Sequence, residues 1–362
     1  MKIGILTFHR AHNYGAVLQA YALVSYLREN GHDAELIDYR PKAIEQAHGT
    51  LPLGRIRKMS FVRKIIYIIR LIPYLVQRKK RADKFKAFIL SLPKSKNVYN
   101  GIRQGIEGYD YIIVGSDQVW NPKITDGFDA YYTGNITTNA KIFSYAASAE
   151  IAPKQEGIEH YNSFLTNFCK LSVRESLFRE QLQQFTSFDI TQVLDPVFLL
   201  SKEQWESFGC NPFDESGYIL VYQVKRDDNV LRYAHELAEY NKCKVMEITA
   251  EADYFPKKNR YTTLSPREFV GAFANARCVV TTSFHGTAFS CIFCKPVKVM
   301  LFNKPGDYRA LDLLNTIGLK DSTITPQSSG KHLIDPLNHP SNINKMIHQS
   351  KQFLDIYDYD KI

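Results

Sequence analysis

The chain has 362 residues, enough for two domains, and its 44% apolar and 23% charged residues are typical of a folded globular protein. This composition excludes a disordered or low-complexity chain, and six cysteines are too few for a disulfide scaffold, so reduced thiols are expected. The net charge of +9 is concentrated in residues 55–86, which hold twelve basic residues and one acid.

The N-terminal residues predict a strand, a loop and a helix. Lys2–Phe8 is a short run of β-forming residues, and apolar side chains recur at helical spacing from Val17 to Leu27 before Gly31, a typical helix stop. Ala34–Tyr39 predicts a second strand, which completes a βαβ unit and indicates a parallel sheet. This N-terminus lacks the features of a signal peptide, so a cytoplasmic protein is expected.

Two series of strands and helices follow along the chain. Further strands of the first series are predicted at Tyr109–Ser116, Lys141–Ser148, Lys170–Glu175 and Thr191–Asp195. The second series has strands at Gly217–Val224, Lys244–Thr249, Cys278–Phe284 and Pro296–Phe302. Before its third strand, Ser265, Pro266 and Glu268 form the pattern of a capped helix start.

These elements predict an α/β protein in which two Rossmann-like domains face a central cleft. The first domain is expected at 1–206, with the basic segment as an insertion at 55–86, and the second at 217–330. A C-terminal helix within 340–362 is expected to pack back on the first domain.

The basic segment, residues 55–86, has an apolar centre at 65–76 that Arg70 and Pro73 interrupt. Twelve residues are too few to cross about 30 Å of hydrocarbon as a helix. Aliphatic residues flanked by Arg and Lys fit an interfacial helix on anionic lipid, and they fit equally a helix packed on the sheet with its charges in solvent. Nucleic-acid binding is not expected, because few aromatic residues are interleaved with the charges.

Polar residues that follow predicted strands are the candidates for chemistry, because ligands of parallel α/β sheets bind at the carboxyl ends of the strands. Asp117 can accept a proton from a substrate hydroxyl or form a turn, and Arg174 can clamp an anion or pair with Glu175. Asp195, before Pro196, fits a strand-end turn better than a catalyst.

His285 follows the third strand of the second series, where Gly286 starts a helix whose first amides favour an anion. Such a histidine fits acid catalysis beside a phosphate, although a lone histidine is commonly structural. The loop at 8–16 contains Gly15 but no G-x-G-x-x-G or P-loop, which excludes those nucleotide sites. The pair Cys291 and Cys294 lies in an apolar helix without a second ligand pair, so core packing is expected and no metal site.

Six motifs, in this order, resemble the polysaccharide pyruvyl transferases. They are HNYGA, GSDQVWNP, FSYAAS, SVRES, VLDPVFLL and TSFHGTAFSCIFCKPV, spread over roughly residues 3–302. The resemblance implies a GT-B-like fold and transfer of a pyruvyl group from phosphoenolpyruvate to a sugar of a surface or capsular polysaccharide precursor. The product would be a pyruvate ketal and free phosphate, with phosphoenolpyruvate as co-substrate and no cofactor.

The resemblance also implies roles for individual residues. His285 would be catalytic, as general acid or phosphate ligand, and Asp117 would activate the acceptor hydroxyl. The donor-binding residues would be Arg174, Ser283, His285, Gly286 and Thr287, and the acceptor-binding residues Asn13, Tyr14, Asp117 and Gln118. Members of the family often carry a basic residue between the Ser and His of the last motif, where this chain has Phe284, so one anion contact is missing.

Three functions remain open on the sequence alone. The first is a pyruvyl transferase acting on a glycan acceptor, lipid-linked and at the inner membrane face if residues 55–86 bind anionic lipid. The second is a nucleotide-sugar-dependent glycosyltransferase of the same GT-B fold, because a fold does not fix the chemistry. The third is a non-catalytic protein that binds glycan or lipid surfaces. The ordered motifs favour the first.

Overall fold

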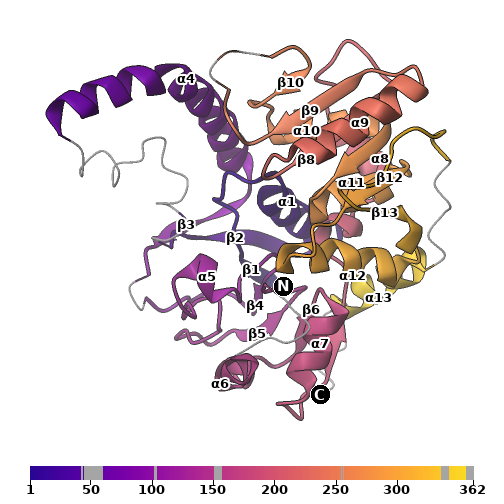
Figure 1. The fold of residues 1–362 in the computed structure, drawn as a ribbon. Coiled ribbons are helices and arrows are strands. Elements are labelled where there is room, and N and C mark those ends of the chain that lie inside the picture. The colour runs from indigo at the N-terminus through magenta and orange to yellow at the C-terminus, as the bar shows by residue number, and fades with distance from the viewer. Residues whose placement is uncertain are drawn as a thin grey trace.

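A computed structural model describes residues 1–41, 44, 60–101, 104–150, 157–253, 255, 257–335 and 342–355 (Figure 1). Their chain forms two parallel sheets, each with helices beside it. The expected α/β architecture of two Rossmann-like domains, the GT-B-like arrangement, is confirmed. Part of the basic segment, residues 55–59, lies outside the described residues.

The first sheet has five parallel strands in the order β3-β2-β1-β4-β5. Their bounds are β1 Lys2–Leu6, β2 Asp33–Tyr39, β3 Lys94–Tyr99, β4 Tyr111–Val114 and β5 Lys141–Ser144. A parallel pair, β6 (Leu171–Val173) and β7 (Ile190–Gln192), continues this sheet through bridges from Phe143 to Lys170 and from Ala147 to Val173. The carboxyl ends of β4, β5 and β6 therefore lie beside one another.

Helix α1 (Tyr14–Glu29) links β1 to β2, and the Asn13 side chain caps it by accepting a hydrogen bond from the amide of Ala16 at 3.3 Å. Gly31 has a φ of 83°, the left-handed conformation that ends many helices. The remaining helices of the first domain are short. They are α5 Pro122–Thr125, η1 Ile158–Tyr161, α6 Asn162–Leu165, α7 Ser176–Gln183, η2 Pro196–Leu199 and α8 Lys202–Phe208.

The second sheet has six parallel strands in the order β10-β9-β8-β11-β12-β13. Their bounds are β8 Tyr218–Gln223, β9 Val245–Thr249, β10 Arg260–Tyr261, β11 Ala276–Thr281, β12 Val297–Met300 and β13 Thr323–Ile324. The helices of this half are α9 Asp228–Tyr240, α10 Pro266–Ala274, α11 Phe284–Ile292, η3 Pro305–Asp307, α12 Tyr308–Ile317 and η4 Lys320–Ser322. The predicted cap of α10 is confirmed, since Ser265 and Glu268 exchange both bonds of a capping box.

One apolar cluster joins the two domains. It runs from α1 and η2 of the first domain to α10 and α11 of the second. At its centre Tyr14 stacks on Phe269 with ring centroids 4.3 Å apart and donates a hydrogen bond to the carbonyl of Leu264. Burial of this kind contributes about 25 cal/mol for each Å² of apolar surface removed from water, so the cluster stabilises the two halves as one body.

Most of the basic segment forms α4 (Phe61–Ser91), which begins far from both sheets and ends in this apolar cluster (Figure 1). Phe85, Phe88 and Ile89 are buried in the cluster. Arg81 donates to the hydroxyl of Tyr14, and Lys84 pairs with Glu268 at 2.6 Å. The C-terminal part of α4 is thus a structural bridge between the domains.

The C-terminal helix α13 (Ile343–Phe353) packs against the first domain. The hydroxyl of Ser350 accepts a hydrogen bond from the amide of Leu194 at 2.8 Å, and Phe353 lies against the rings of Phe143 and Tyr145. Within the described ranges, no helix is both long and apolar enough to cross a lipid bilayer.

Candidate functional site

A cleft of about 1090 Å³ lies between the carboxyl ends of the two sheets. Its walls come from loops that follow strands of both domains: the loops after β1 and β4 on one side, and those after β8, β11 and β12 on the other. Among the residues that line it are Asn13, Asp117, Gln118, Lys123, Glu150, Lys225, Arg226, Ser283, His285, Lys304 and Arg309. Five of the residues expected at a site therefore meet in one cleft: Asn13, Asp117, Gln118, Ser283 and His285.

His285 lies in the first turn of α11, where the helix starts at the end of β11. Its side chain is 9% exposed, and its Nε2 atom lies 3.5 Å from a carboxylate oxygen of Asp195. This separation suits an ion pair but is longer than a normal hydrogen bond, and Nε2 has no hydrogen-bond partner in the described part of the chain. The other ring nitrogen, Nδ1, lies beside Gly15 of the first domain.

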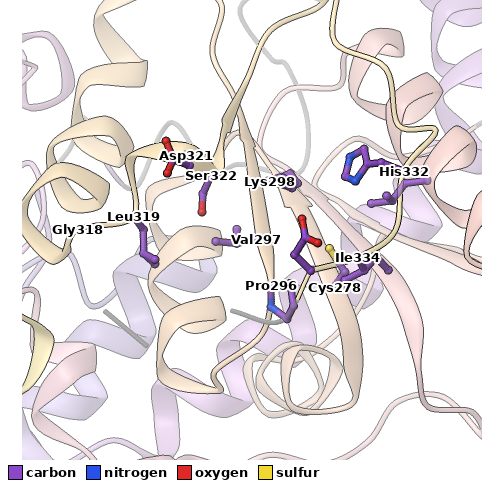
Figure 2. A pocket seen from close by; sticks show the side chains of 12 residues that line it. Cys278, Pro296, Val297, Lys298, Gly318, Leu319, Asp321, Ser322, His332 and Ile334 are labelled. Atoms are coloured by element: carbon purple, nitrogen blue, oxygen red, sulfur yellow. The ribbon is translucent and has the colours of Figure 1, made fainter. Parts of the chain in front are cut away.

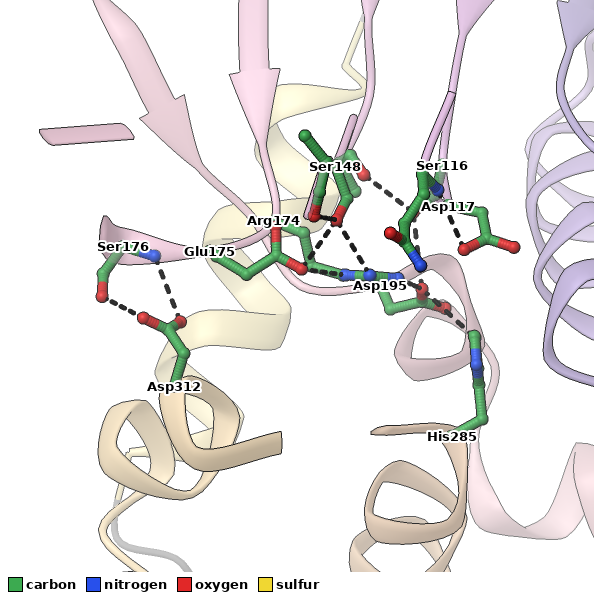
Figure 3. Close-up of polar contacts among 12 residues, drawn as sticks. Ser116, Asp117, Ser148, Arg174, Glu175, Ser176, Asp195, His285 and Asp312 are labelled. Atoms are coloured by element: carbon green, nitrogen blue, oxygen red, sulfur yellow. Dashed lines mark hydrogen bonds and ion pairs between the residues drawn. The ribbon is translucent and has the colours of Figure 1, made fainter. Parts of the chain in front are cut away.

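Asp195 is the centre of the polar network behind His285 (Figure 3). Its fully buried carboxylate accepts hydrogen bonds from Arg174 at 2.8 Å and from the hydroxyl of Ser116 at 3.4 Å. Burial alone would raise the pKa of Asp195, but His285, Arg174 and the amide of Val197 hold it at about 2. Asp195 is thus a permanent anion beside His285, as well as the turn-forming cap of η2 that the sequence suggested.

Arg174 has a different environment from the one expected of an anion clamp. Its side chain is 2% exposed, and it donates to Glu175 at 2.8 Å, to Asp195 at 2.8 Å and to the hydroxyl of Ser148 at 3.1 Å. Burial would lower its pKa, but the two carboxylates raise it above the usual value. The salt-bridge alternative therefore describes the contacts of Arg174, which lies behind the cleft and not on its wall.

The acceptor-side residues occupy the opposite wall. Asp117 has a φ of 70°, a left-handed conformation that Asp tolerates, and its carboxylate accepts a hydrogen bond from the amide of Gln118 at 2.9 Å. The Gln118 side chain accepts a hydrogen bond from Asn121 at 2.7 Å. The second carboxylate oxygen of Asp117 has no hydrogen-bond donor among the described residues, so it is available to a ligand hydroxyl.

Besides Arg174, three expected site residues do not line the cleft. Tyr14 is 1% exposed and belongs to the apolar cluster between the domains, because α1 turns that face towards α10. Thr287 is fully buried, and its amide and hydroxyl both donate to the carbonyl of Ser283. Gly286 donates its amide to the Ser283 side chain, and a Cβ there would lie 2.3 Å from Thr281, so this glycine serves close packing. The expectation of a ligand role for Tyr14, Gly286 and Thr287 is corrected accordingly.

The amides of α11 that are open to an anion are those of its first two residues. In the described part of the chain, the backbone N–H groups of Phe284 and His285 have no acceptor, as the first amides of a helix normally do not. Ser283 caps the helix and also lines the cleft. A ligand oxyanion beside His285 would therefore meet two free amides and the positive end of a helix dipole.

Arg309 is a cleft residue that sequence reasoning missed. It lies in the first turn of α12, lines the cleft, and also lines a small cavity behind it together with Arg174 and Phe284. Among the described residues it makes no hydrogen bond or ion pair. Burial and the Arg174 charge hold its pKa below the usual value, partly offset by the carboxylates of Asp117 and Glu175. No motif surrounds it, so only its place after the strand Pro296–Phe302 could have pointed to it.

A second cavity of about 160 Å³ lies in the second domain, near Cys278, Val297 and His332 (Figure 2). It is at the amino ends of β11 and β12, opposite to the ends that face the cleft, and none of the expected site residues lines it. Burial raises the pKa of the Cys278 thiol to about 12, so this group is a protonated, unreactive thiol at neutral pH. The cleft is therefore the better candidate for chemistry.

The cysteines at 291 and 294 face different environments. Cys291 is buried, and burial raises its pKa to about 12, whereas Cys294 is exposed at the end of α11. In the ranges that the structure describes, no three His, Cys, Asp or Glu side chains gather as metal ligands.

The arrangement in the cleft can support proton transfer and anion binding. A histidine beside a permanent carboxylate can exchange a proton, and two free amides with an unpaired arginine can hold an oxyanion. A second carboxylate, Asp117, lies across the cleft and can accept a hydroxyl proton.

Several solved structures of other proteins are similar to this chain. The fold is similar to UDP-GlcNAc 2-epimerase from Methanocaldococcus jannaschii, with 11% identity, coverage of 97% of this chain and 92% of the other, and a TM-score of 0.48. UDP-GlcNAc 2-epimerase from Neisseria meningitidis has 10% identity, coverage of 98% of this chain and 100% of the other, and a TM-score of 0.43. The calicheamicin glycosyltransferase CalG4 has 13% identity, coverage of 97% of this chain and 93% of the other, and a TM-score of 0.42. Such low identities do not bear on the reaction.

A comparison with curated proteins gives no match. The family model of the polysaccharide pyruvyl transferases matches residues 13–300, a span that begins at the cap of α1 and includes both walls of the cleft around Asp117 and His285, and the buried Arg174 network. The chain therefore belongs to the polysaccharide pyruvyl transferase family.

Proposed function

We propose that this protein transfers the pyruvyl group of phosphoenolpyruvate to two hydroxyls of one sugar in a surface or capsular polysaccharide precursor. The observation that carries the proposal is His285, which lines the cleft at the start of α11 with two free amides beside it and Asp117 on the facing wall. Family membership supports the same reaction.

In the first step the methylene carbon of phosphoenolpyruvate gains a proton, which makes its neighbouring carbon C2 electrophilic. His285 donates this proton, while the Asp195 carboxylate 3.5 Å from Nε2 stabilises the positive ring. A sugar hydroxyl then attacks C2, and Asp117 accepts the hydroxyl proton. In this step a C–H and a C–O bond form, the C=C π bond and the hydroxyl O–H bond break, and the bond to phosphate is still intact.

In the second step the phosphate leaves and the ketal closes. The bond between C2 and the phosphate oxygen breaks, the second sugar hydroxyl bonds to C2, and its proton balances the charge on the released phosphate. The free amides of Phe284 and His285 stabilise the departing oxyanion, as oxyanion-binding amides do in other enzymes. In the whole reaction, the methyl group gains a proton from His285, Asp117 takes the proton of the first hydroxyl, and phosphate takes the proton of the second. Exchange with solvent then removes the proton from Asp117 and restores the one on His285.

The first test needs no acceptor. The thermal unfolding midpoint is measured with phosphoenolpyruvate and with a panel of nucleotide sugars, because a ligand that binds the native state raises the midpoint. We expect a rise with phosphoenolpyruvate that is lost in His285→Ala and kept in Asp117→Asn. If only a nucleotide sugar raises the unfolding midpoint, the protein is a nucleotide-sugar-dependent glycosyltransferase instead.

We propose further that the protein works in the cytoplasm on an acceptor at the inner membrane face, with α4 as its contact to anionic lipid. Figure 1 shows α4 extending beyond both sheets. In its described middle part Ile72 and Val76 are 52% and 65% exposed, next to the exposed cations Arg78, Lys79 and Lys80. Exposed aliphatic residues beside cations are what an interfacial helix needs.

A further inference from the structure

The last motif, TSFHGTAFSCIFCKPV, has no basic residue between Ser283 and His285. Phe284 stands where members of the family often carry a basic residue, and its ring lies 4.0 Å from the guanidinium carbon of Arg174. Phe284 also lines both the cleft and the small cavity of about 10 Å³ behind it. The phenylalanine thus stands between Arg174 and the cleft, and Arg174 is already bonded to Glu175 and Asp195. Neither position 284 nor position 174 offers an uncommitted cation.

Arg309 is a cation of the cleft that lies near both Phe284 and Arg174. It lines the cleft together with Phe284 and His285, and it shares the small cavity with Arg174. In the described part of the chain it has no hydrogen-bond acceptor and no ion-pair partner. Arginine has five N–H donors, and those of Arg309 are partly exposed in the cleft, where a ligand can accept hydrogen bonds from them. The neighbouring Arg174 charge repels Arg309.

An arrangement of this kind is relieved by an anionic ligand. The planar guanidinium matches a carboxylate or a phosphate through two parallel hydrogen bonds, which are stronger than bonds between neutral groups. The other end of the same ligand would meet the free amides at the start of α11. Phosphoenolpyruvate carries one carboxylate and one phosphate, so it can present one oxyanion to Arg309 and the other to the amides of α11.

We propose that Arg309 takes the place of the basic residue missing at position 284 and binds an oxyanion of the donor. The inference rests on the proposed function for the identity of the donor, and on the contacts of Arg309 for the anion site itself. It makes Arg309 a donor-binding residue in a chain whose last motif has lost one.

The experiment measures dissociation constants by titration calorimetry for the wild type, Arg309→Gln and Arg309→Lys. The probes are phosphoenolpyruvate, inorganic phosphate and pyruvate. We expect Arg309→Gln to weaken phosphoenolpyruvate binding about 100-fold, the scale of losing charge-assisted hydrogen bonds to one ligand group, and Arg309→Lys to weaken it less. Loss of pyruvate binding assigns Arg309 to the carboxylate, and loss of phosphate binding assigns it to the phosphate.

Lys304→Gln is the matched control, because Lys304 is an exposed cation on the same cleft. It should leave the dissociation constant within a factor of about three, since exposed charges are largely screened. Wild-type affinity in Arg309→Gln, or an equal loss in Lys304→Gln, would overturn the inference. If the wild type does not bind phosphoenolpyruvate, the proposed function fails, and the anion site is still judged by inorganic phosphate in the same variants.

A second measurement separates binding from structure. Without ligand, Arg309→Gln should unfold at the same temperature as the wild type or a higher one, because repulsion between Arg174 and Arg309 is relieved. A lower unfolding temperature together with unchanged anion binding would show a structural arginine and refute the assignment.

Discussion

Gly15, in the first turn of α1, lies directly against the imidazole ring of His285. A Cβ atom at position 15 would come within 2.0 Å of Nδ1 and 2.4 Å of Cγ. Gly15 of the first domain thus packs against His285 of the second domain, and only glycine fits at position 15. The motif HNYGA is therefore as much a part of the His285 site as the motif SFHG.

The substitution Gly15→Ala should displace the His285 ring while α1 stays helical, because alanine is a better helix former than glycine. We expect phosphate release from phosphoenolpyruvate and acceptor to fall about 100-fold, as for a 1 Å misplacement of a catalytic group. Gly306→Ala is the control, since Gly306 also lines the cleft but has open space around its Cβ position. Equal rates in the two variants would contradict a tight fit between Gly15 and His285.

The low pKa of Asp195 makes its contribution to the free energy of unfolding sensitive to acid. Its pKa is about 2 in the folded protein and 3.8 in the unfolded chain, so its ionised form stabilises the fold above about pH 4 and this contribution is lost as pH falls towards 2. Asp195→Asn should lower the free energy of unfolding at pH 7 by about 2 kcal/mol, the equivalent of that shift.

The difference in unfolding free energy between the wild type and Asp195→Asn should then narrow between pH 4 and pH 2. Glu175 titrates in the opposite direction, because burial raises its pKa, but it is present in both proteins and cancels from the difference. Denaturant unfolding at several pH values measures the effect. If the difference in unfolding free energy stays constant down to pH 2, His285 and Arg174 do not hold the pKa of Asp195 below its usual value.

The buried position of Arg174 predicts a loss of stability in Arg174→Ala. Glu175 and Asp195 would be left buried without their cation, which destabilises a protein by about 3 to 5 kcal/mol. The exposed Arg277→Ala should change the free energy of unfolding by less than about 0.5 kcal/mol. If Arg174→Ala unfolds like the wild type, the ion-pair network is not a structural one, and a ligand role for Arg174 gains support.

The sequence predicts best what depends on neighbouring residues. The βαβ opening and the cap at Ser265 follow from local patterns, and the structure has both. Asp117 and His285 could be found because each follows a strand, and the carboxyl ends of parallel strands gather at one edge. The sequence left open whether Arg174 clamps an anion or pairs with its neighbour Glu175, and it did not show that the distant Asp195 also holds Arg174.

Two further differences have the same origin. The resemblance of the HNYGA motif implied a sugar-side role for Tyr14, but its ring packs on Phe269 from the other half of the chain. Arg309 carries no motif, and its importance comes from the absence of partners around it, which only the tertiary structure shows.

The membrane contact of α4 is tested with charge reversal instead of deletion, because removal of residues 55–86 would also remove Phe85 from the core and Lys84 from its pair with Glu268. The triple variant Arg78→Glu, Lys79→Glu, Lys80→Glu changes exposed side chains only. Sedimentation with vesicles that contain anionic phospholipid measures binding. Each cation near such a surface contributes about 1 kcal/mol, so three reversals should abolish sedimentation at physiological salt.

The control reverses three exposed lysines far from α4 in the sequence, namely Lys320, Lys331 and Lys345. This variant has the same net charge as the first, so a general loss of charge would weaken vesicle binding equally in both. A contact through α4 requires binding to persist in the control, and donor binding measured by thermal unfolding should be the same in both variants. Persistent sedimentation of the α4 variant would leave the helix as a bridge between the domains, formed by Arg81, Lys84 and the apolar residues beside them.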